Sequence, residues 1–170
     1  MINIYADGAC KKNPGPGGYG IVVSRDGEII YTQATYCENT TTNNKEELKG
    51  LLDALWLTQT KYKNEICTIY SDSAYCVNMF NSWIKGWARN NWINSQKKQV
   101  ENLELVQKIY KFTELDFPNF KVCKVPGHAG VLENELADAL ASKNDKKLTK
   151  LVEENNICIR KRTVRMQRSL

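Results

Sequence analysis

Apolar and polar residues in the first third of the chain follow a pattern that predicts strands at residues 2–6, 19–24 and 28–36. Asp26 and Gly27 stand between the second and third of these strands, and an Asp-Gly pair favours the tight type I′ turn of a β-hairpin. The first and second strands are joined by residues 11–18, a loop rich in Gly and Pro. The pattern therefore predicts three consecutive antiparallel strands.

After residue 40 the apolar residues recur at helical spacing. Thr and Asn residues that can cap a helix come first, and leucines then repeat at intervals of three and four residues. We expect this helix at residues 43–61, a strand at 65–71, a short helix at 73–81, a helix at 100–112, a strand at 120–125 and a last helix at 133–143. The order β-β-β-α-β-α-α-β-α predicts an α/β fold, with a mixed sheet and helices packed on it.

Two strand ends carry the same local pattern. Residues 4–8 (IYADG) and 69–73 (IYSDS) both run apolar, aromatic, small, aspartate, small, which places Asp7 and Asp72 in the same phase. If the helix at 43–61 belongs to a crossover connection, the two strands pair in parallel, about 4.8 Å apart. Two carboxylates that close share a proton or hold a hard divalent cation, whereas a lone aspartate is more simply a cap or turn residue.

A third acid is expected near this pair. The leucine stripe of the helix at 43–61 places Glu47 on the flank of the buried face and Glu46 nearly opposite the core, so Glu47 can reach the sheet edge. Both could also be ordinary first-turn acids that interact with the helix dipole. Periodicity alone leaves Asp138 as a solvated charge, and it leaves His128 as an exposed loop residue that could shuttle a proton.

Composition limits the class of protein. A chain of 170 residues with 42% hydrophobic content predicts one domain with one core. We expect a cytoplasmic protein with reduced thiols, because the sequence has no membrane-spanning apolar stretch, no secretory signal pattern and six widely spaced cysteines. The formal charge of +5 favours a polyanionic partner without naming it.

The last part of the chain changes character. We divide the sequence into a domain at residues 1–143 and a basic extension at 144–170, partly ordered or disordered. Cations crowd the end of this extension, at Arg160, Lys161, Arg162, Arg165 and Arg168. The extension could bind nucleic acid, although a solvated terminus is the simpler interpretation.

Six segments in order resemble one family. They are YADGACKKNPGPGGYG, TTNNKEEL, YSDSAY, a Trp-rich stretch, VPGHAG and NELADALA, and through them residues 1–143 resemble ribonuclease H of type 1. The resemblance implies a five-stranded mixed sheet whose first three strands are antiparallel. It also implies an endoribonuclease that hydrolyses the RNA strand of RNA–DNA hybrids and leaves 5′-phosphate and 3′-hydroxyl ends.

The same resemblance implies the site residues. It assigns metal binding and catalysis to Asp7, Glu47, Asp72 and Asp138, and a role in proton transfer or product release to His128. It thus selects Glu47 over Glu46, and it gives Asp138 a role that periodicity could not. The implied cofactor is Mg²⁺, as two ions about 4 Å apart, with Mn²⁺ as a possible substitute.

Substrate residues are also implied by the resemblance. It places Cys10, Asn13 and Asn43 near the RNA strand and Thr42 near a DNA phosphate. A basic protrusion for the DNA backbone would include Trp83, Lys85, Trp87, Arg89 and Trp92. Tryptophans at this spacing also suit core packing, and the chain departs from some relatives at Ala74 and in the asparagines between its cations. We therefore expect weaker hybrid affinity.

Two alternatives remain open at this stage. One is a non-catalytic module that binds hybrids, and the presence of all four acids argues against it. The other is a nuclease domain that serves a reverse transcriptase or another retroelement protein, or a relative that acts on DNA, because integrases share the fold. The main expectation is a monomeric enzyme that acts on RNA–DNA hybrids.

Overall fold

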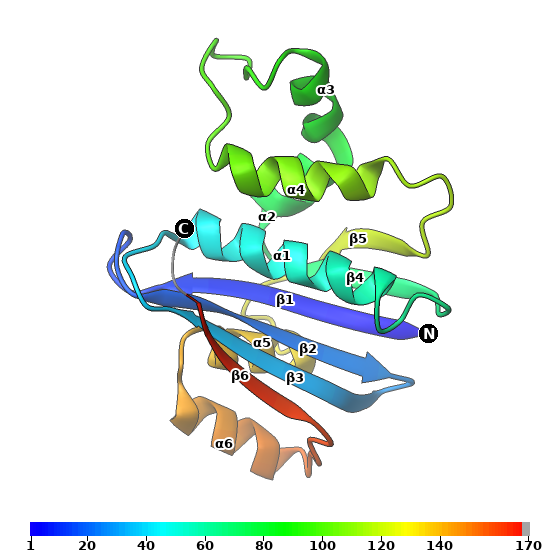
Figure 1. Cartoon of the computed structure of the whole chain (residues 1–170). Helices are drawn as coiled ribbons and strands as arrows, with labels where there is room; N and C mark the ends of the chain where they lie inside the picture. Colours follow the sequence, from blue (N-terminus) through cyan, green and yellow to red (C-terminus); the bar gives the residue numbers. More distant parts are fainter. Residues whose placement is uncertain (168–170) are drawn as a thin grey trace.

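The computed structural model describes residues 1–167 and contains one mixed sheet of six strands in the order β5-β4-β1-β2-β3-β6 (Figure 1). The strands are β1 (Ile2–Cys10), β2 (Gly17–Arg25), β3 (Glu28–Cys37), β4 (Cys67–Ser71), β5 (Phe120–Lys124) and β6 (Arg162–Gln167). The α/β class is confirmed.

The central strands pair as the sequence predicts. β1, β2 and β3 are antiparallel, and the β2–β3 turn has positive φ angles of 51° at Asp26 and 84° at Gly27, which suit an Asp-Gly turn. β4 pairs with β1 in parallel, with Ile4 opposite Ile69 and Tyr5 opposite Tyr70. The predicted parallel pairing of the two matching strand ends is therefore confirmed.

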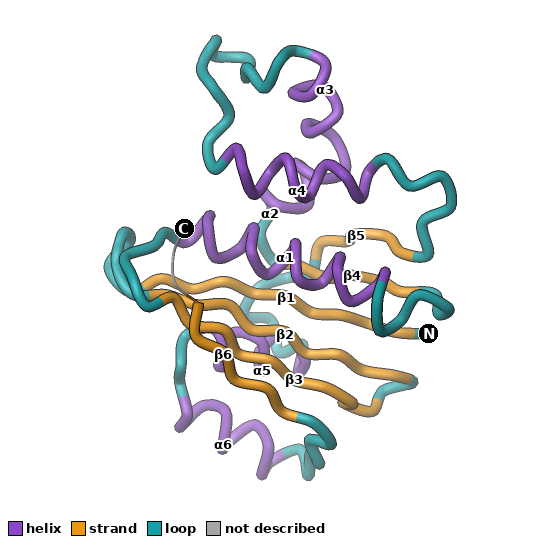
Figure 2. Tube along the Cα trace, viewed as in Figure 1, coloured by secondary structure: helices purple, strands orange, loops and turns teal. Residues whose placement is uncertain are grey.

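Helices cover both faces of the sheet (Figure 2). On one face lie α1 (Asn43–Gln59) and α4 (Leu103–Thr113), and on the other lies α5 (Leu132–Ala141), against which α6 (Asp145–Glu154) packs. Alternate residues of β1 enter the two resulting cores, so that Ile4 packs with the α1 side and Tyr5 with the α5 side.

Between β4 and α4 the chain forms three short helical segments. α2 (Ala74–Asn78), the π-helix η1 (Met79–Trp83) and α3 (Ile84–Arg89) follow one another, so helical structure continues well past the predicted limit at residue 81. Figure 2 shows α3 and the loop after it standing away from the sheet, with α4 between them and α1.

The expected number of strands was wrong. The resemblance implied five, whereas the extension supplies a sixth, β6, which pairs in parallel with β3 from Thr32 opposite Arg162 to Cys37 opposite Gln167. Val164 and Met166 are 56% and 57% exposed, so β6 has no buried face that would produce an apolar alternation in the sequence. β6 is held in the sheet by its backbone pairing with β3, so the hydrophobic pattern of the sequence does not predict it. Within residues 1–167, no helix is long and apolar enough to cross a membrane.

Candidate metal centre and active site

Three carboxylates meet just beyond the point where the parallel pairing of β1 with β4 ends, at Tyr5 and Tyr70; β1 itself continues past Asp7 to Cys10. Asp7 lies on β1, Asp72 directly follows β4, and Glu47 lies in the early part of α1. Each offers an oxygen, and these oxygens all lie within 4.8 Å of one another. Asp7 is only 4% exposed, so this group lies largely out of solvent.

A glycine brings α1 close enough for Glu47 to join the two aspartates. A Cβ atom at Gly8 would lie 2.4 Å from the backbone nitrogen of Glu47, closer than any side chain tolerates. The absence of a side chain therefore lets β1 touch the start of α1 directly. The Gly8 backbone N–H also donates a hydrogen bond to the Glu47 carboxylate.

The three carboxylates are close together and partly buried, so their negative charges repel one another and are poorly solvated. Burial, followed by repulsion from Glu47 and Asp72, raises the pKa of Asp7 well above its usual range. Burial and repulsion from Asp72 likewise raise the pKa of Glu47, which is hydrogen-bonded to Asp7. Within residues 1–167, no salt bridge links any of the three to Lys, Arg or His. An all-oxygen group of this kind fits a hard divalent cation.

The loop before α5 and the start of that helix enclose Asp72. The Asn134 side-chain amide donates a hydrogen bond of 3.2 Å to Asp72 Oδ2, and a Cβ atom at Gly127 would lie 3.0 Å from the same oxygen. Asn134 is 2% exposed. The sequence did not predict this role for Asn134, although the residue lies within the NELADALA segment. An Asn in the first turn of a helix is usually an exposed polar residue, so nothing in the pattern marked it.

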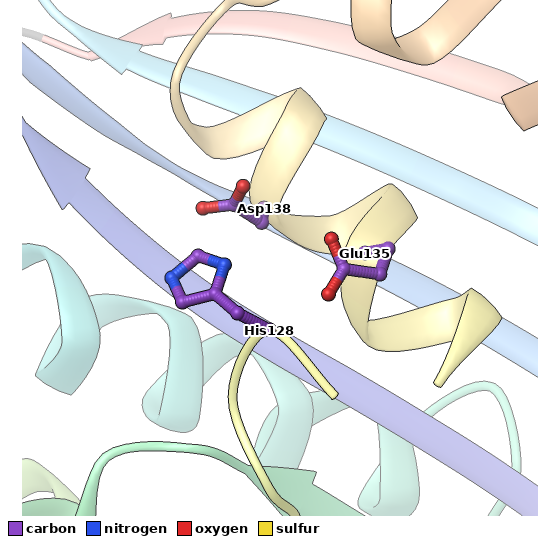
Figure 3. A group of neighbouring side chains, drawn as sticks. All are labelled: His128, Glu135 and Asp138. Atoms are coloured by element: carbon purple, nitrogen blue, oxygen red, sulfur yellow. The ribbon is translucent and has the colours of Figure 1, made fainter. Parts of the chain in front are cut away.

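A second group of titratable side chains lies beside the first. His128, Glu135 and Asp138 offer atoms within 4.8 Å of one another, and Figure 3 shows the imidazole facing the helix that carries both carboxylates. His128 has a φ of 49°, a left-handed conformation in the loop between β5 and α5. Asp138 also raises the pKa of Asp7 by repulsion, so its charge acts on the first group as well.

The second group, unlike the first, contains a cation from the same chain. Lys147 Nζ lies 2.6 Å from a Glu135 oxygen and 2.7 Å from Asp138 Oδ2. Neither Lys147 nor Glu135 was a predicted site residue. The i,i+3 spacing of Glu135 and Asp138 was the available signal for Glu135, since it places both acids on one side of the helix.

The expected position of Glu46 was wrong. Its side chain is 1% exposed rather than directed away from the protein, and it accepts hydrogen bonds of 2.7 Å from Thr41 Oγ1 and 2.8 Å from Lys49 Nζ. The extended segment before α1 pairs with the Gly-rich loop, through Gly15 and Thr41, and covers this side of the helix start. The leucine stripe indicates only which face of the helix packs on the sheet, so it does not predict that a loop buries Glu46.

The residues expected near the RNA strand form a connected rim. The Cys10 thiol donates to the carbonyl oxygens of Thr41 at 3.3 Å and Gly15 at 3.4 Å. Asn13 Oδ1 accepts a 3.1 Å hydrogen bond from the backbone N–H of Asn43. Thr42 caps α1 by accepting from the Lys45 N–H at 3.2 Å, so these residues lie around the helix start that carries Glu47.

The expected protrusion divides into surface and core residues. Lys85 and Arg89 are exposed, and Trp83 is 41% exposed, with its ring centroid 6.0 Å from that of Trp87. Trp87 and Trp92 instead pack against the core, and the Trp92 ring meets the Tyr110 ring edge-on. Core packing therefore accounts for two of the tryptophans and leaves Trp83 as the exposed aromatic face.

Comparison with known proteins identifies the family. The family model for RNase H matches residues 1–146. The chain is 41% identical to a ribonuclease H of Caldicellulosiruptor saccharolyticus over 143 residues, which are 82% of this chain and 92% of that protein. It is 37% identical to a ribonuclease H of Orientia tsutsugamushi over 155 residues, which are 91% of this chain and 88% of that protein.

A solved structure agrees with this assignment. LC9-RNase H1, described as a type 1 RNase H with the type 2 active-site motif, is 29% identical, with a TM-score of 0.67 over 82% of this chain and 69% of that one. The RNase H family model covers residues 1–146, which include all of the carboxylates described above. The chain belongs to the ribonuclease H family.

Proposed function

We propose that this chain is an endoribonuclease that hydrolyses the RNA strand of RNA–DNA hybrids and uses divalent cations held by Asp7, Glu47, Asp72 and Asp138. The observation that carries the proposal is the group of three buried or half-buried carboxylate side chains that form no salt bridge with any cation of residues 1–167. Membership of the ribonuclease H family supports the substrate and the reaction. The products would carry 5′-phosphate and 3′-hydroxyl ends.

The proposed chemistry follows from the donor set. Bound at these carboxylates, two Mg²⁺ ions would activate a water molecule and stabilise the departing 3′ oxygen. Asn134 would hold the Asp72 carboxylate in one orientation by donating to Oδ2, and Gly127, which has no side chain, would leave room for that carboxylate. His128, on an exposed loop beside Asp138, is placed to exchange a proton with solvent.

Substrate selection is proposed to use two surfaces. The rim formed by Cys10, Asn13, Thr42 and Asn43 would follow the RNA strand and an adjacent DNA phosphate, since it surrounds the start of the helix that carries Glu47. Trp83, Lys85 and Arg89 would meet the DNA backbone, because they are the exposed aromatic and cationic residues of the protrusion. Trp87 would support Trp83, because their ring centroids lie 6.0 Å apart and Trp87 packs against the core.

One substitution tests the proposal. Asp72→Asn keeps the size of the side chain and its contact with Asn134 while it removes a charge, so we expect a folded protein that no longer cleaves a labelled hybrid in Mg²⁺. Cleavage by the unchanged chain should also stop in EDTA. Asp116→Asn, an exposed acid outside the site, is the matched control. Normal cleavage by the Asp72 variant would refute the site assignment.

A comparison of substrates tests the specificity. Hybrid, duplex DNA and duplex RNA of one sequence should be incubated with the chain in Mg²⁺, and only the RNA strand of the hybrid should be cut. Preference for duplex DNA would instead support a relative that acts on DNA. Binding of the hybrid without metal-dependent cleavage would support the non-catalytic alternative.

A further inference from the structure

Lys147 occupies a position that the proposed chemistry does not explain. It lies in the first turn of α6, immediately beyond residue 146, where the family match ends. Its ammonium group contacts both Glu135 and Asp138, although Asp138 is proposed to bind metal. The three side chains are only 16–26% exposed, so solvent screens these ion pairs less than it screens a surface pair.

The fold holds Lys147 firmly at this position. Asn144 caps α6, because its Oδ1 accepts the Lys147 backbone N–H at 3.0 Å. The next residue, Leu148, is 6% exposed and packs into the core on the α5 side of the sheet. A capped backbone and a buried neighbour fix where the lysine stem begins, which lowers the entropy lost when its ammonium group reaches α5.

Asp138 therefore has two possible cationic partners. Its carboxylate contributes to the negative potential around Asp7 and Glu47, and its Oδ2 atom already accepts from Lys147. Glu135 and Asp138 would repel each other without a nearby cation, so the lysine stabilises this pair when no metal is bound. A positive charge this close also opposes the arrival of a divalent cation.

We propose that Lys147 is a positioning residue that acts through Asp138: it holds the Asp138 and Glu135 carboxylates in the metal-free protein and competes with the divalent cation for Asp138. This inference rests on the proposed function, because it takes Asp138 as a metal ligand. Its consequence is that the extension sets the cation concentration at which the centre fills. Helix α6 of the extension thus has a direct link to the site through Lys147.

Metal binding without substrate tests this inference. Lys147→Met removes the charge and keeps an apolar stem, so we expect Mn²⁺, titrated by calorimetry, to bind about threefold to tenfold more tightly. The same variant in EDTA should melt at a lower temperature, because Glu135 and Asp138 lose their shared cation. Lys147→Arg should bind Mn²⁺ nearly as the unchanged chain does.

The neighbouring lysine provides a matched control. Lys146 is exposed and makes no salt bridge within residues 1–167, so Lys146→Met removes the same charge from the same helix turn and should leave Mn²⁺ affinity unchanged. Asp138→Asn should make the Lys147→Met change ineffective, because the lysine acts through that carboxylate. Lys147→Gln replaces Lys147→Met if the latter does not fold, as judged by circular dichroism.

The outcomes separate this inference from the proposed function. Unchanged or weaker Mn²⁺ affinity in the Lys147 variant overturns the competition, and so does an equal gain in the Lys146 variant, which would indicate a general effect of net charge. If Mn²⁺ binds and Lys147 modulates it while the unchanged chain cleaves no hybrid, the proposed function fails and the inference stands.

Discussion

The two groups of acids at this site differ in how their charge is balanced. Asp7, Glu47 and Asp72 lie together with no salt bridge to a cation of residues 1–167, and burial followed by repulsion raises the pKa of Asp7 and Glu47. Glu135 and Asp138 lie beside them with Lys147 between their carboxylates. The first group therefore carries an electrostatic cost that an external cation would relieve, whereas the chain itself neutralises much of the second. The missing counter-charge, rather than the proximity of acids alone, favours a metal at the first group, and Asp138 joins that proposal through the family and through its repulsion of Asp7.

The largest expected effect separates the two groups by activity. Asp7→Asn should reduce hybrid cleavage at saturating Mg²⁺ by about a hundredfold or more, because it removes a charge from the group that no cation within residues 1–167 balances. Glu135→Gln should reduce it by about tenfold or less, since Lys147 and Asp138 remain paired. Single-turnover rates of both variants measure the difference. Equal losses would contradict the distinction between the groups.

A second effect concerns stability in EDTA. The folded-state pKa of Asp7 is raised, so the native state holds a proton that the unfolded chain releases above its ordinary pKa of about 3.9. The native state then binds more protons than the unfolded state, and the free energy of unfolding falls as the pH rises from about 4 toward the raised value. Asp7→Asn removes this loss.

Chemical denaturation checks that prediction. The Asp7→Asn protein should be more stable than the unchanged chain by about 1–3 kcal/mol at pH 8, and the gap should shrink toward pH 4. Glu135→Gln should show the opposite sign, because it leaves the Lys147 ammonium with one partner fewer. An Asp7 variant that is no more stable than the unchanged chain at pH 8 would show that the first group carries no such cost.

The sequence predicted those parts of the site that depend on the side-chain periodicity of a single strand or helix. The matching ends of β1 and β4 located Asp7 and Asp72, because equal phase on parallel neighbours places both side chains at one edge. The helical phase favoured Glu47 but misplaced Glu46, whose carboxylate is bound by Thr41, and Thr41 in turn pairs with Gly15 of the distant Gly-rich loop. The periodicity of one helix contains no information about a loop from another part of the chain that covers it.

The features contributed by the extension were not predicted for the same physical reason. Lys147 reaches Asp138 only because α6 turns back over α5, and β6 pairs with β3 through its backbone rather than through an apolar face. Resemblance to the family ended before both elements. Neither a salt bridge across helices nor a strand with exposed side chains produces a periodic signal.

The smallest expected effect concerns the cations of β6. β1, β3, β4 and β6 all run in the same direction, so the carboxyl end of β6 lies at the sheet edge where Asp7 and Asp72 lie. Arg165 is nearer that end than Arg162, and both are exposed. Arg160 already pairs with Glu28 at 3.0 Å, and Arg168 lies outside the described residues. Among the described arginines of the extension, Arg165 is therefore the best placed to meet a bound nucleic acid.

Single substitutions examine this role without removing α6 and β6, whose loss would also remove Lys147. Arg165→Gln should weaken hybrid binding slightly and reduce the slope of log affinity against log salt by about 0.9, which corresponds to one phosphate contact. Arg162→Gln removes the same charge from the far end of the same strand and should change the slope less. Filter binding in EDTA at several salt concentrations measures both. An equal reduction of the slope in the two variants would assign the effect to net charge, and an unchanged slope in both would leave β6 as a structural strand whose arginines do not contact the hybrid.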